Sequence, residues 1–330
     1  MFPAARCNSF LLNSTKMAPS VVLFGYDSSV FTQKVRFALR IKQVPYQFVI
    51  VSSMLPRPVL RNNFQLTYRK IPVCVIGREV FCDTSIILEA LEHHFPASAG
   101  YGTLYPAAQD GRTNRALIRG FASYWTDRPL FRFTTGLIPA WVWRTDFRKD
   151  REGLIGDAID AAKLAKKIPE NLSGLDMQLS VLEPQMAEAD AAHPWLFSTA
   201  APSLADVALF TQLNWGCDIA GGRGTRDLTG GAADADERAG GAAPVFNALR
   251  YPKVCGWFDA FRAYLDRLPS LESVLADPEP ALSCVREAAL PDAVPLLPTP
   301  VFAHAELDRQ NGLTDGAEVF VAPDDTGRAK

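Results

Sequence analysis

The sequence predicts an α/β domain near the N-terminus, with its elements in the order βαβ–ββα, followed by an all-helical domain. Between about residues 21 and 95, short apolar runs rich in β-branched residues are interleaved with segments of helical periodicity. After Tyr105 the strand-like runs largely disappear and helical patterns take over. The length of 330 residues also fits two domains better than one.

The first half of the α/β domain has the pattern of a βαβ unit. Residues 21–26 (VVLFGY) form an apolar run that ends in a turn containing Ser28 and Ser29. Residues 30–42 then place apolar side chains at helical spacing, and either serine is a suitable N-cap for that helix. The run YQFVIV at 46–51 predicts a second strand, which a right-handed crossover makes parallel to the first.

The second half is predicted as two antiparallel strands and a helix. We expect an irregular connection over residues 52–70, because it contains two prolines and no clear periodicity. A third strand at 73–77 and a fourth at 79–82 are joined by a Gly-Arg pair that suits a hairpin turn. A helix capped by Asp83 follows.

Helical periodicity marks much of the rest of the chain. The helical patterns lie near residues 110–126, 153–168, 172–190, 203–216 and 252–267. Ser203-x-x-Asp206 has the form of a capping box. Residues 220–244 are rich in Gly and Ala, which predicts a flexible insertion between helices. The chain therefore divides into four predicted parts: residues 1–19 as an unstructured leader, 20–100 as the α/β domain, 106–275 as the helical domain and 276–330 as a tail of unclear structure.

The composition excludes several classes of function. The formal net charge is −2, with no long run of one sign in the ordered-looking parts. This argues against a nucleic-acid partner, because phosphate binding needs clustered Lys and Arg. No apolar stretch approaches the roughly 20 residues that span a bilayer, so we expect no membrane partner.

The six cysteines indicate neither a disulfide scaffold nor a metal site. They form no C-x-x-C pair and fit no zinc template, so we expect no metal. Reduced thiols in a cytoplasmic protein are the favoured interpretation. A mitochondrial location is the alternative, because the leader contains Arg6 and Lys16 but no acid and weakly resembles a transit peptide. A start at Met17 would fit the rest of the chain equally well.

The turn at Ser28 and Ser29 is a candidate anion site. A strand that runs into a helix N-terminus leaves unpaired N–H groups and the positive end of the helix dipole. Such a place stabilises an anion, including a thiolate, and a Ser hydroxyl adds one more donor. Plain N-capping is the competing interpretation, and from the spacing alone it is favoured.

Two further pairs of residues lie at the start of a predicted strand or helix and are candidate ligand contacts. Ile71 and Pro72 begin a predicted strand, where proline is tolerated for structural reasons alone. With a cis bond, the backbone of Ile71 would face outward and could pair with a peptide-like ligand. Asp83 and Thr84 stand at a helix start, where capping is the simpler interpretation.

Taken together, these residues resemble the glutathione S-transferase superfamily from about Val21 to Leu275. The segment VVLFGYDSSVFTQKVRFAL resembles the family's first βα unit, Ile71-Pro72 its cis-proline segment, and DTSIILEALE its acidic-Ser-x-x-Ile segment. Downstream, PWLFSTAAPSLADVALF and YPKVCGWFDAFRAYLDRLPS resemble two helices of its second domain. TYRKIPVCVIG and FCDTSIILEALEHHFP are most similar to fungal glutathione transferase-like proteins.

The resemblance implies a thioredoxin-like first domain with glutathione as co-substrate. It implies that Ser29 faces the glutathione sulfur, with Ser28 as the alternative. Ile71 and Pro72 would pair with the cysteinyl part, and Asp83 and Thr84 would hold the γ-glutamyl group. A homodimer is also implied.

The implied activity is conjugation of glutathione to a small apolar electrophile, or isomerisation of one. A non-catalytic binding or scaffold protein of the same fold is the alternative. A dithiol redox protein is disfavoured, because Ser29 and Thr32 stand where a C-x-x-C pair would be needed. Six aromatic residues could line the acceptor site, although packing in the helix core is the favoured interpretation for most of them: Tyr124, Trp125, Phe131, Phe133, Trp141 and Trp143.

Overall fold

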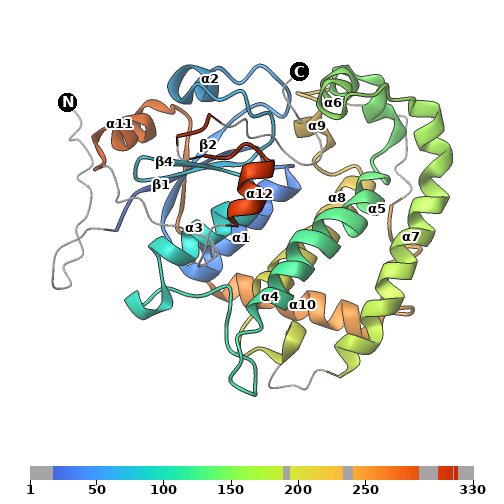
Figure 1. The fold of residues 1–330 in the computed structure, drawn as a ribbon. Helices are drawn as coiled ribbons and strands as arrows, with labels where there is room; N and C mark the ends of the chain where they lie inside the picture. Colours follow the sequence, from blue (N-terminus) through green and yellow to red (C-terminus); the bar gives the residue numbers. More distant parts are fainter. Residues whose placement is uncertain (1–17, 189–193, 233–240, 290–303, 315, 319–330) are drawn as a thin grey trace, which may run out of the picture.

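A mixed five-stranded sheet lies in one half of the molecule, and a group of helices forms the other half (Figure 1). The computed structural model describes residues 18–188, 194–232, 241–289, 304–314 and 316–318. The predicted fold class, an α/β domain followed by helices, is confirmed. Residues 1–17 of the predicted leader and 233–240 of the predicted insertion lie outside the described residues.

The sheet has the strand order β4-β3-β1-β2-β5, so the first strand is central. The strands are β1 (Val21–Gly25), β2 (Tyr46–Ile50), β3 (Val73–Ile76), β4 (Glu79–Cys82) and β5 (Glu272–Leu275). β1 pairs in parallel with β2 and antiparallel with β3, and β3 pairs antiparallel with β4. The first four strands lie where the sequence predicts them, to within one residue at each end.

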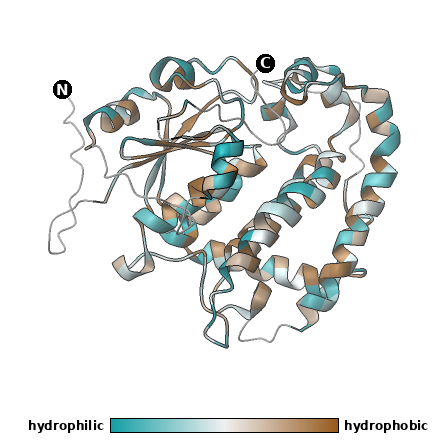
Figure 2. Cartoon of the chain, viewed as in Figure 1, coloured by the Kyte–Doolittle hydropathy of each residue, from teal (hydrophilic) through white to brown (hydrophobic). Residues whose placement is uncertain are grey.

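Helices cover both faces of the sheet (Figure 1). One face carries α1 (Val30–Lys42) and α3 (Thr84–His94), and the other carries α2 (Pro58–Phe64) and α11 (Glu279–Glu287). Side chains alternate along each strand, so Leu23 packs in the first core and Val22 in the second. Figure 2 shows the consequence, a sheet whose strands are apolar while the surrounding helices carry polar outer faces.

Helix α2 corrects the prediction of an irregular connection over residues 52–70. Pro58 stands at its first turn, where the missing N–H has no helical partner in any case. Leu60 is its only buried residue and packs on the sheet. A seven-residue helix with one buried side chain shows too little periodicity to be recognised in the sequence.

Strand β5 and helix α11 return to the sheet after the helical half of the chain. β5 extends the sheet in parallel beside β2. The carboxylate of Glu272 accepts two hydrogen bonds of 2.7 Å from the Arg36 guanidinium and one from the Tyr46 hydroxyl. The sequence assigns residues 272–275 to the end of the helical domain and later residues to a tail of unclear structure. Their sheet contacts could not be read locally, because the partner strand lies far away along the chain.

The helical half contains eight helices in the described residues: α4 (Arg115–Gly120), the π-helix η2 (Phe121–Leu130), α5 (Phe131–Thr135), α6 (Asp146–Ile155), α7 (Ala161–Ala187), α8 (Leu204–Ala220), α9 (Thr225–Leu228) and α10 (Pro252–Arg267). Shorter 3-10 segments lie at Ala97–Ala99, Ala140–Arg144 and Leu196–Ser198, and α12 spans Ala305–Gln310. The prediction of one helix at 153–168 is wrong. α6 ends at Ile155, where the C-cap Gly156 has a φ of 85° that suits glycine, and α7 begins after the Asp160 cap.

Helix α8 is the buried centre of the helical half, and it packs against α1, α5 and η2. The predicted capping box of Ser203 and Asp206 is confirmed. The Asp206 carboxylate accepts hydrogen bonds of 2.8–2.9 Å from Ser203 N–H and Oγ, Leu196 N–H and Trp257 Nε1. Burial raises the pKa of Asp206 to about 6, although these four donors oppose the shift.

The predicted flexible insertion at 220–244 needs correction in its first half. Thr225 to Leu228 form helix α9, and Leu228 is buried among side chains of both halves of the molecule. The Gly- and Ala-rich composition of this segment does not predict the packing, because few of its residues are apolar and the residues that Leu228 contacts lie elsewhere in the chain.

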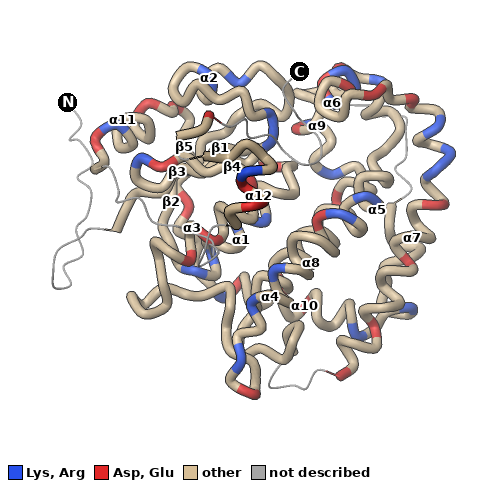
Figure 3. Tube along the Cα trace, in the orientation of Figure 1, with Lys and Arg blue, Asp and Glu red and all other residues tan. Residues whose placement is uncertain are grey.

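Lys and Arg positions are interspersed with Asp and Glu positions along the backbone trace (Figure 3). None of the described helices combines the length and apolar character that a membrane crossing requires.

Candidate functional site

Strand register brings the three predicted site segments to one edge of the sheet. Phe24 near the end of β1 lies opposite Val73 at the start of β3, and Val73 lies opposite Cys82 at the end of β4. The turn after β1, the Ile71–Pro72 pair before β3 and the Asp83–Thr84 pair after β4 therefore leave the sheet side by side.

Ser29 is the N-cap of α1, and its side chain is almost fully buried. Its Oγ accepts a hydrogen bond of 3.2 Å from the Thr32 N–H, so the hydroxyl proton is still available for donation. Gly25 allows this turn to pack closely, because a Cβ there would lie 2.5 Å from the Thr32 methyl group. The cap is the role that the sequence predicts for this residue.

Ser28 is held by the helical half of the molecule. Its backbone N–H donates to Asp227 Oδ2 at 2.6 Å, and its carbonyl oxygen accepts from Trp215 Nε1 at 2.8 Å. Its Oγ is buried without a hydrogen-bond partner among the described residues. The sequence gives no signal for the roles of Asp227 and Trp215, since neither belongs to a local motif.

Ile71 and Pro72 are joined by a cis peptide bond, the isomer that the resemblance implies. Ile71 is half-buried and contacts both the sheet core and the aromatic cluster described below. The register of β1 and β3 places this pair beside the turn after β1.

Asp83 caps α3, and its Oδ1 accepts a hydrogen bond of 2.8 Å from the Ser85 N–H. The residue is exposed to solvent. Its φ of 79° lies in the left-handed region that few non-glycine residues adopt. Strained backbone of this kind clusters at ligand-binding sites. Thr84 follows as the first helical residue and is buried.

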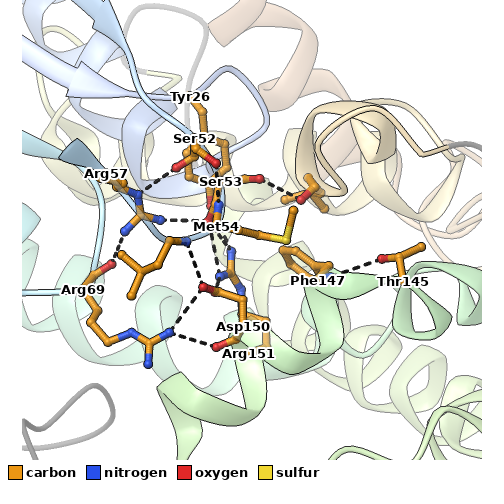
Figure 4. A network of polar contacts seen from close by, with 12 residues as sticks. Tyr26, Ser52, Ser53, Met54, Arg57, Arg69, Thr145, Phe147, Asp150 and Arg151 are labelled. Carbon is orange, nitrogen blue, oxygen red and sulfur yellow. Dashed lines mark hydrogen bonds and ion pairs between the residues drawn. The ribbon is translucent and has the colours of Figure 1, made fainter. Parts of the chain in front are cut away.

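A buried arginine stabilises the loop after β2 (Figure 4). The Arg57 guanidinium donates to the carbonyl oxygens of Ser52, Arg69 and Ser53 at 2.6–2.8 Å. Burial lowers the pKa of Arg57. Because its donors serve backbone carbonyls, this guanidinium supports the loop.

The helical half reaches the same loop through α6 (Figure 4). The Asp150 carboxylate accepts a hydrogen bond of 3.0 Å from the Leu55 N–H and one of 3.3 Å from the Arg69 guanidinium. It also forms an ion pair with Arg151. Arg151 in turn lies 3.4 Å from the Tyr26 hydroxyl at the end of β1. These contacts connect the two halves at the edge where the candidate site lies.

An aromatic cluster borders the N-terminus of α1. Phe31 lies 5.0 Å from Phe131, and Phe131 lies 6.2 Å from Trp215, both between ring centroids. Three of the six aromatic residues proposed from the sequence belong to this cluster: Phe131, Trp141 and Trp143. Trp125 and Phe133 pack against the main core and Tyr124 is exposed, so these three lie away from it.

Two thiols of the sheet, Cys74 and Cys82, are poor nucleophiles. The five cysteines in the described part of the chain are unpaired. Burial raises the pKa of Cys74 to about 12 and that of Cys82 to about 11, so both stay protonated at neutral pH. The described residues contain no group of three or more His, Cys, Asp or Glu side chains that could hold a metal ion.

Comparison with known proteins finds relatives of the α/β half of the chain. A family model described as "Glutathione S-transferase, N-terminal domain" matches residues 23–99. A "Probable glutathione S-transferase" of Solanum tuberosum is 30% identical over 132 residues, which is 40% of this chain and 52% of that protein. The α/β half of the chain is thus similar to the N-terminal domain of glutathione S-transferases. The chain spans about half the length of this curated relative.

Solved structures share the glutathione S-transferase fold. A GST-like protein from Pseudomonas syringae superposes with a TM-score of 0.51 at 22% identity, covering 84% of this chain and 78% of that one. The Tau class glutathione S-transferase of Mangifera indica gives 0.50 at 17% identity, covering 74% and 89%. A second family model, "Domain of unknown function (DUF7962)", matches residues 137–228, which include α6 to α9.

Proposed function

We propose that this protein is a glutathione transferase, which joins glutathione to a small apolar electrophile or isomerises one with its help. The observation that carries the proposal is the shared sheet edge at which Ser29, Ile71 and Asp83 lie. The name of the potato relative, a probable glutathione S-transferase, supports the same co-substrate.

Each segment is proposed to take one part of glutathione. The Asp83 carboxylate pairs with the γ-glutamyl ammonium group, and the ligand's α-carboxylate lies near Thr84 at the N-terminus of α3. The backbone of Ile71, next to Pro72, pairs with the cysteinyl part as a short strand addition. The sulfur then lies at the N-terminus of α1, beside Ser29.

The proposed chemistry is activation of the glutathione thiol. A free thiol has a pKa of about 8.5, and lowering it by two units needs roughly 2.7 kcal/mol of preference for the thiolate. A hydrogen bond to a charged partner supplies about 1.5–3 kcal/mol, and the helix dipole adds to it. The thiol proton leaves to solvent, the thiolate receives the Ser29 hydroxyl hydrogen bond, and sulfur forms a bond to carbon as the leaving group departs with its electron pair.

The electrophile is proposed to approach from the aromatic cluster. Phe31 and Phe131 are only partly buried near the N-terminus of α1, and the buried Trp141 belongs to the same cluster, which suits an apolar acceptor.

Substitution of Ser29 tests the proposal. Ser29→Ala should keep glutathione affinity within a few fold, because the other segments still bind, while turnover with an aryl halide falls about 10- to 100-fold as the sulfur loses its donor. Ultraviolet difference titration should also show a smaller thiolate band. Unchanged turnover in Ser29→Ala, with loss in Ser28→Ala instead, would transfer the role to Ser28.

A non-catalytic binding module is the second candidate. The Asp227 carboxylate, which lies against the turn before Ser29, favours it, because a negative charge there opposes a thiolate. Retention on immobilised glutathione with no thiolate absorbance at any pH would support this alternative.

Several finer points stay predictions. The homodimer rests on the family resemblance and is testable by light scattering. The domain limits 20–100 and 106–275 and the likeness to fungal members rest on sequence patterns. The cytoplasmic location fits the free cysteines, which suit a reducing compartment.

A further inference from the structure

Helix α9 and its flanking glycines pack directly on the turn that carries Ser28. A Cβ at Gly224, which has a φ of 77°, would lie 3.1 Å from the Ser28 Cβ. Four residues later, the Leu228 carbonyl oxygen accepts a hydrogen bond of 2.8 Å from the hydroxyl of the buried Ser53, which lies just after β2. Gly230, with a φ of 68°, packs against Met54 in the same way. Residues 224–230, called the α9 segment below, therefore pack closely on the turn after β1 and on the end of β2.

The α9 segment and α8 each form a hydrogen bond with the backbone of Ser28. Asp227 accepts the Ser28 N–H at 2.6 Å, and Trp215 donates to the Ser28 carbonyl oxygen at 2.8 Å. Ser29 follows directly, with its own N–H bonded to the Tyr26 carbonyl oxygen. The direction of the Ser29 hydroxyl thus depends on two side chains of the helical half.

Asp227 also brings a negative charge to the N-terminal end of α1. The other charged groups around this turn are paired in the described part of the chain: Asp27 and Glu272 with Arg36, Asp150 with Arg151, and Lys34 with Asp127. No ion pair to Asp227 occurs among the described residues. Its charge therefore acts on the turn with little local compensation.

We propose that Asp227 is a positioning residue that holds the Ser28–Ser29 turn, and that its charge limits how readily the bound thiol loses its proton. This inference rests on the proposed function, since it requires glutathione sulfur at Ser29. The carboxylate holds the turn through a hydrogen bond and opposes a second anion one residue away along the chain.

The test separates charge from hydrogen bonding. Asp227→Asn keeps an acceptor oxygen for Ser28 and removes the charge. The pKa of the bound glutathione thiol should then fall by about 0.5–1 unit, which gives roughly three- to tenfold more thiolate below that pKa. The acidic limb of the kcat/KM profile for the electrophile, measured at saturating glutathione, should shift by the same amount. Trp215→Phe removes a hydrogen bond to Ser28 without changing charge, so it should lower kcat without this downward shift.

Asp218→Asn is the matched control, because Asp218 lies at the end of α8 and pairs with Arg223 instead. It should titrate as the wild type does. Far-ultraviolet circular dichroism and melting curves verify that each variant folds. Equal thiol pKa values in wild type and Asp227→Asn, with glutathione binding intact, would overturn this inference alone. Failure of the wild type to bind glutathione would overturn the proposed function and this inference together.

Discussion

At the scale of single residues, Asp83 combines a structural and a proposed binding role that one substitution can separate. Its side chain caps α3, and its carboxylate is proposed to pair with the ligand's ammonium group. Asparagine caps a helix as well as aspartate does and also tolerates positive φ. Asn at this position therefore preserves the local fold and removes only the charge.

We expect Asp83→Asn to weaken glutathione binding about tenfold, equivalent to roughly 1.4 kcal/mol, with a melting temperature close to that of the wild type. Isothermal titration calorimetry measures the affinity. Asp83→Ala should lose the cap as well and cost about 1 kcal/mol of stability. An affinity unchanged by Asp83→Asn would exclude the ammonium contact.

The residues that could be predicted from the sequence are those with a local signal. Ser29 and Asp83 each precede a helical pattern, and Pro72 opens a strand-like run. Asp227 and Trp215 could not be found in this way, because their contacts with Ser28 form only when α8 and α9 pack on the sheet edge. Helix caps carry a local sequence signal, whereas the groups that contact those caps from distant parts of the chain carry none.

At the scale of elements, the same contrast holds. α1 and α10 have the limits that periodicity predicts, and β4 follows a recognisable turn. β5 and α11 could not be predicted. β5 is four residues long with largely exposed side chains, and its stability comes from pairing with β2 and from the Arg36–Glu272 ion pair.

The cap of α8 gives a pH dependence that belongs to this scale. The folded-state pKa of Asp206 is about 6, whereas an unfolded aspartate titrates near 3.9. The folded state therefore holds the proton more tightly, so this contribution to stability is full below about pH 4 and disappears as pH rises through 6. A difference of two units corresponds to about 3 kcal/mol.

Asp206→Asn removes that titration, although it also loses acceptor capacity for two donors. The free energy of unfolding of the wild type, relative to the variant, should fall by about 3 kcal/mol between pH 4 and pH 7. Urea unfolding at several pH values measures it. Parallel curves for the two proteins over this range would contradict the assigned pKa.

At the scale of the whole molecule, the α/β half is built from two segments that lie far apart in the chain. Residues 21–94 supply four strands and three helices. Residues 272–287 add the fifth strand and a helix on the face of the sheet that α2 also covers. The helical half lies between these two contributions and holds the edge turns through Asp150 and Asp227. The two halves are therefore expected to unfold together.

Leu282 tests this arrangement, because it is 4% exposed on α11 and packs with Phe24 and Leu60 in the core between α11, α2 and the sheet. Leu282→Ala should lower the free energy of unfolding by about 2–4 kcal/mol, since it leaves a cavity there. Tryptophan fluorescence, which reports mainly on the helical half, and circular dichroism should still give coincident transitions. The exposed Glu287→Ala on the same helix should change stability by less than about 0.5 kcal/mol. A Leu282→Ala effect as small as that of Glu287→Ala would mean that α11 is peripheral and that the sheet is stable without it.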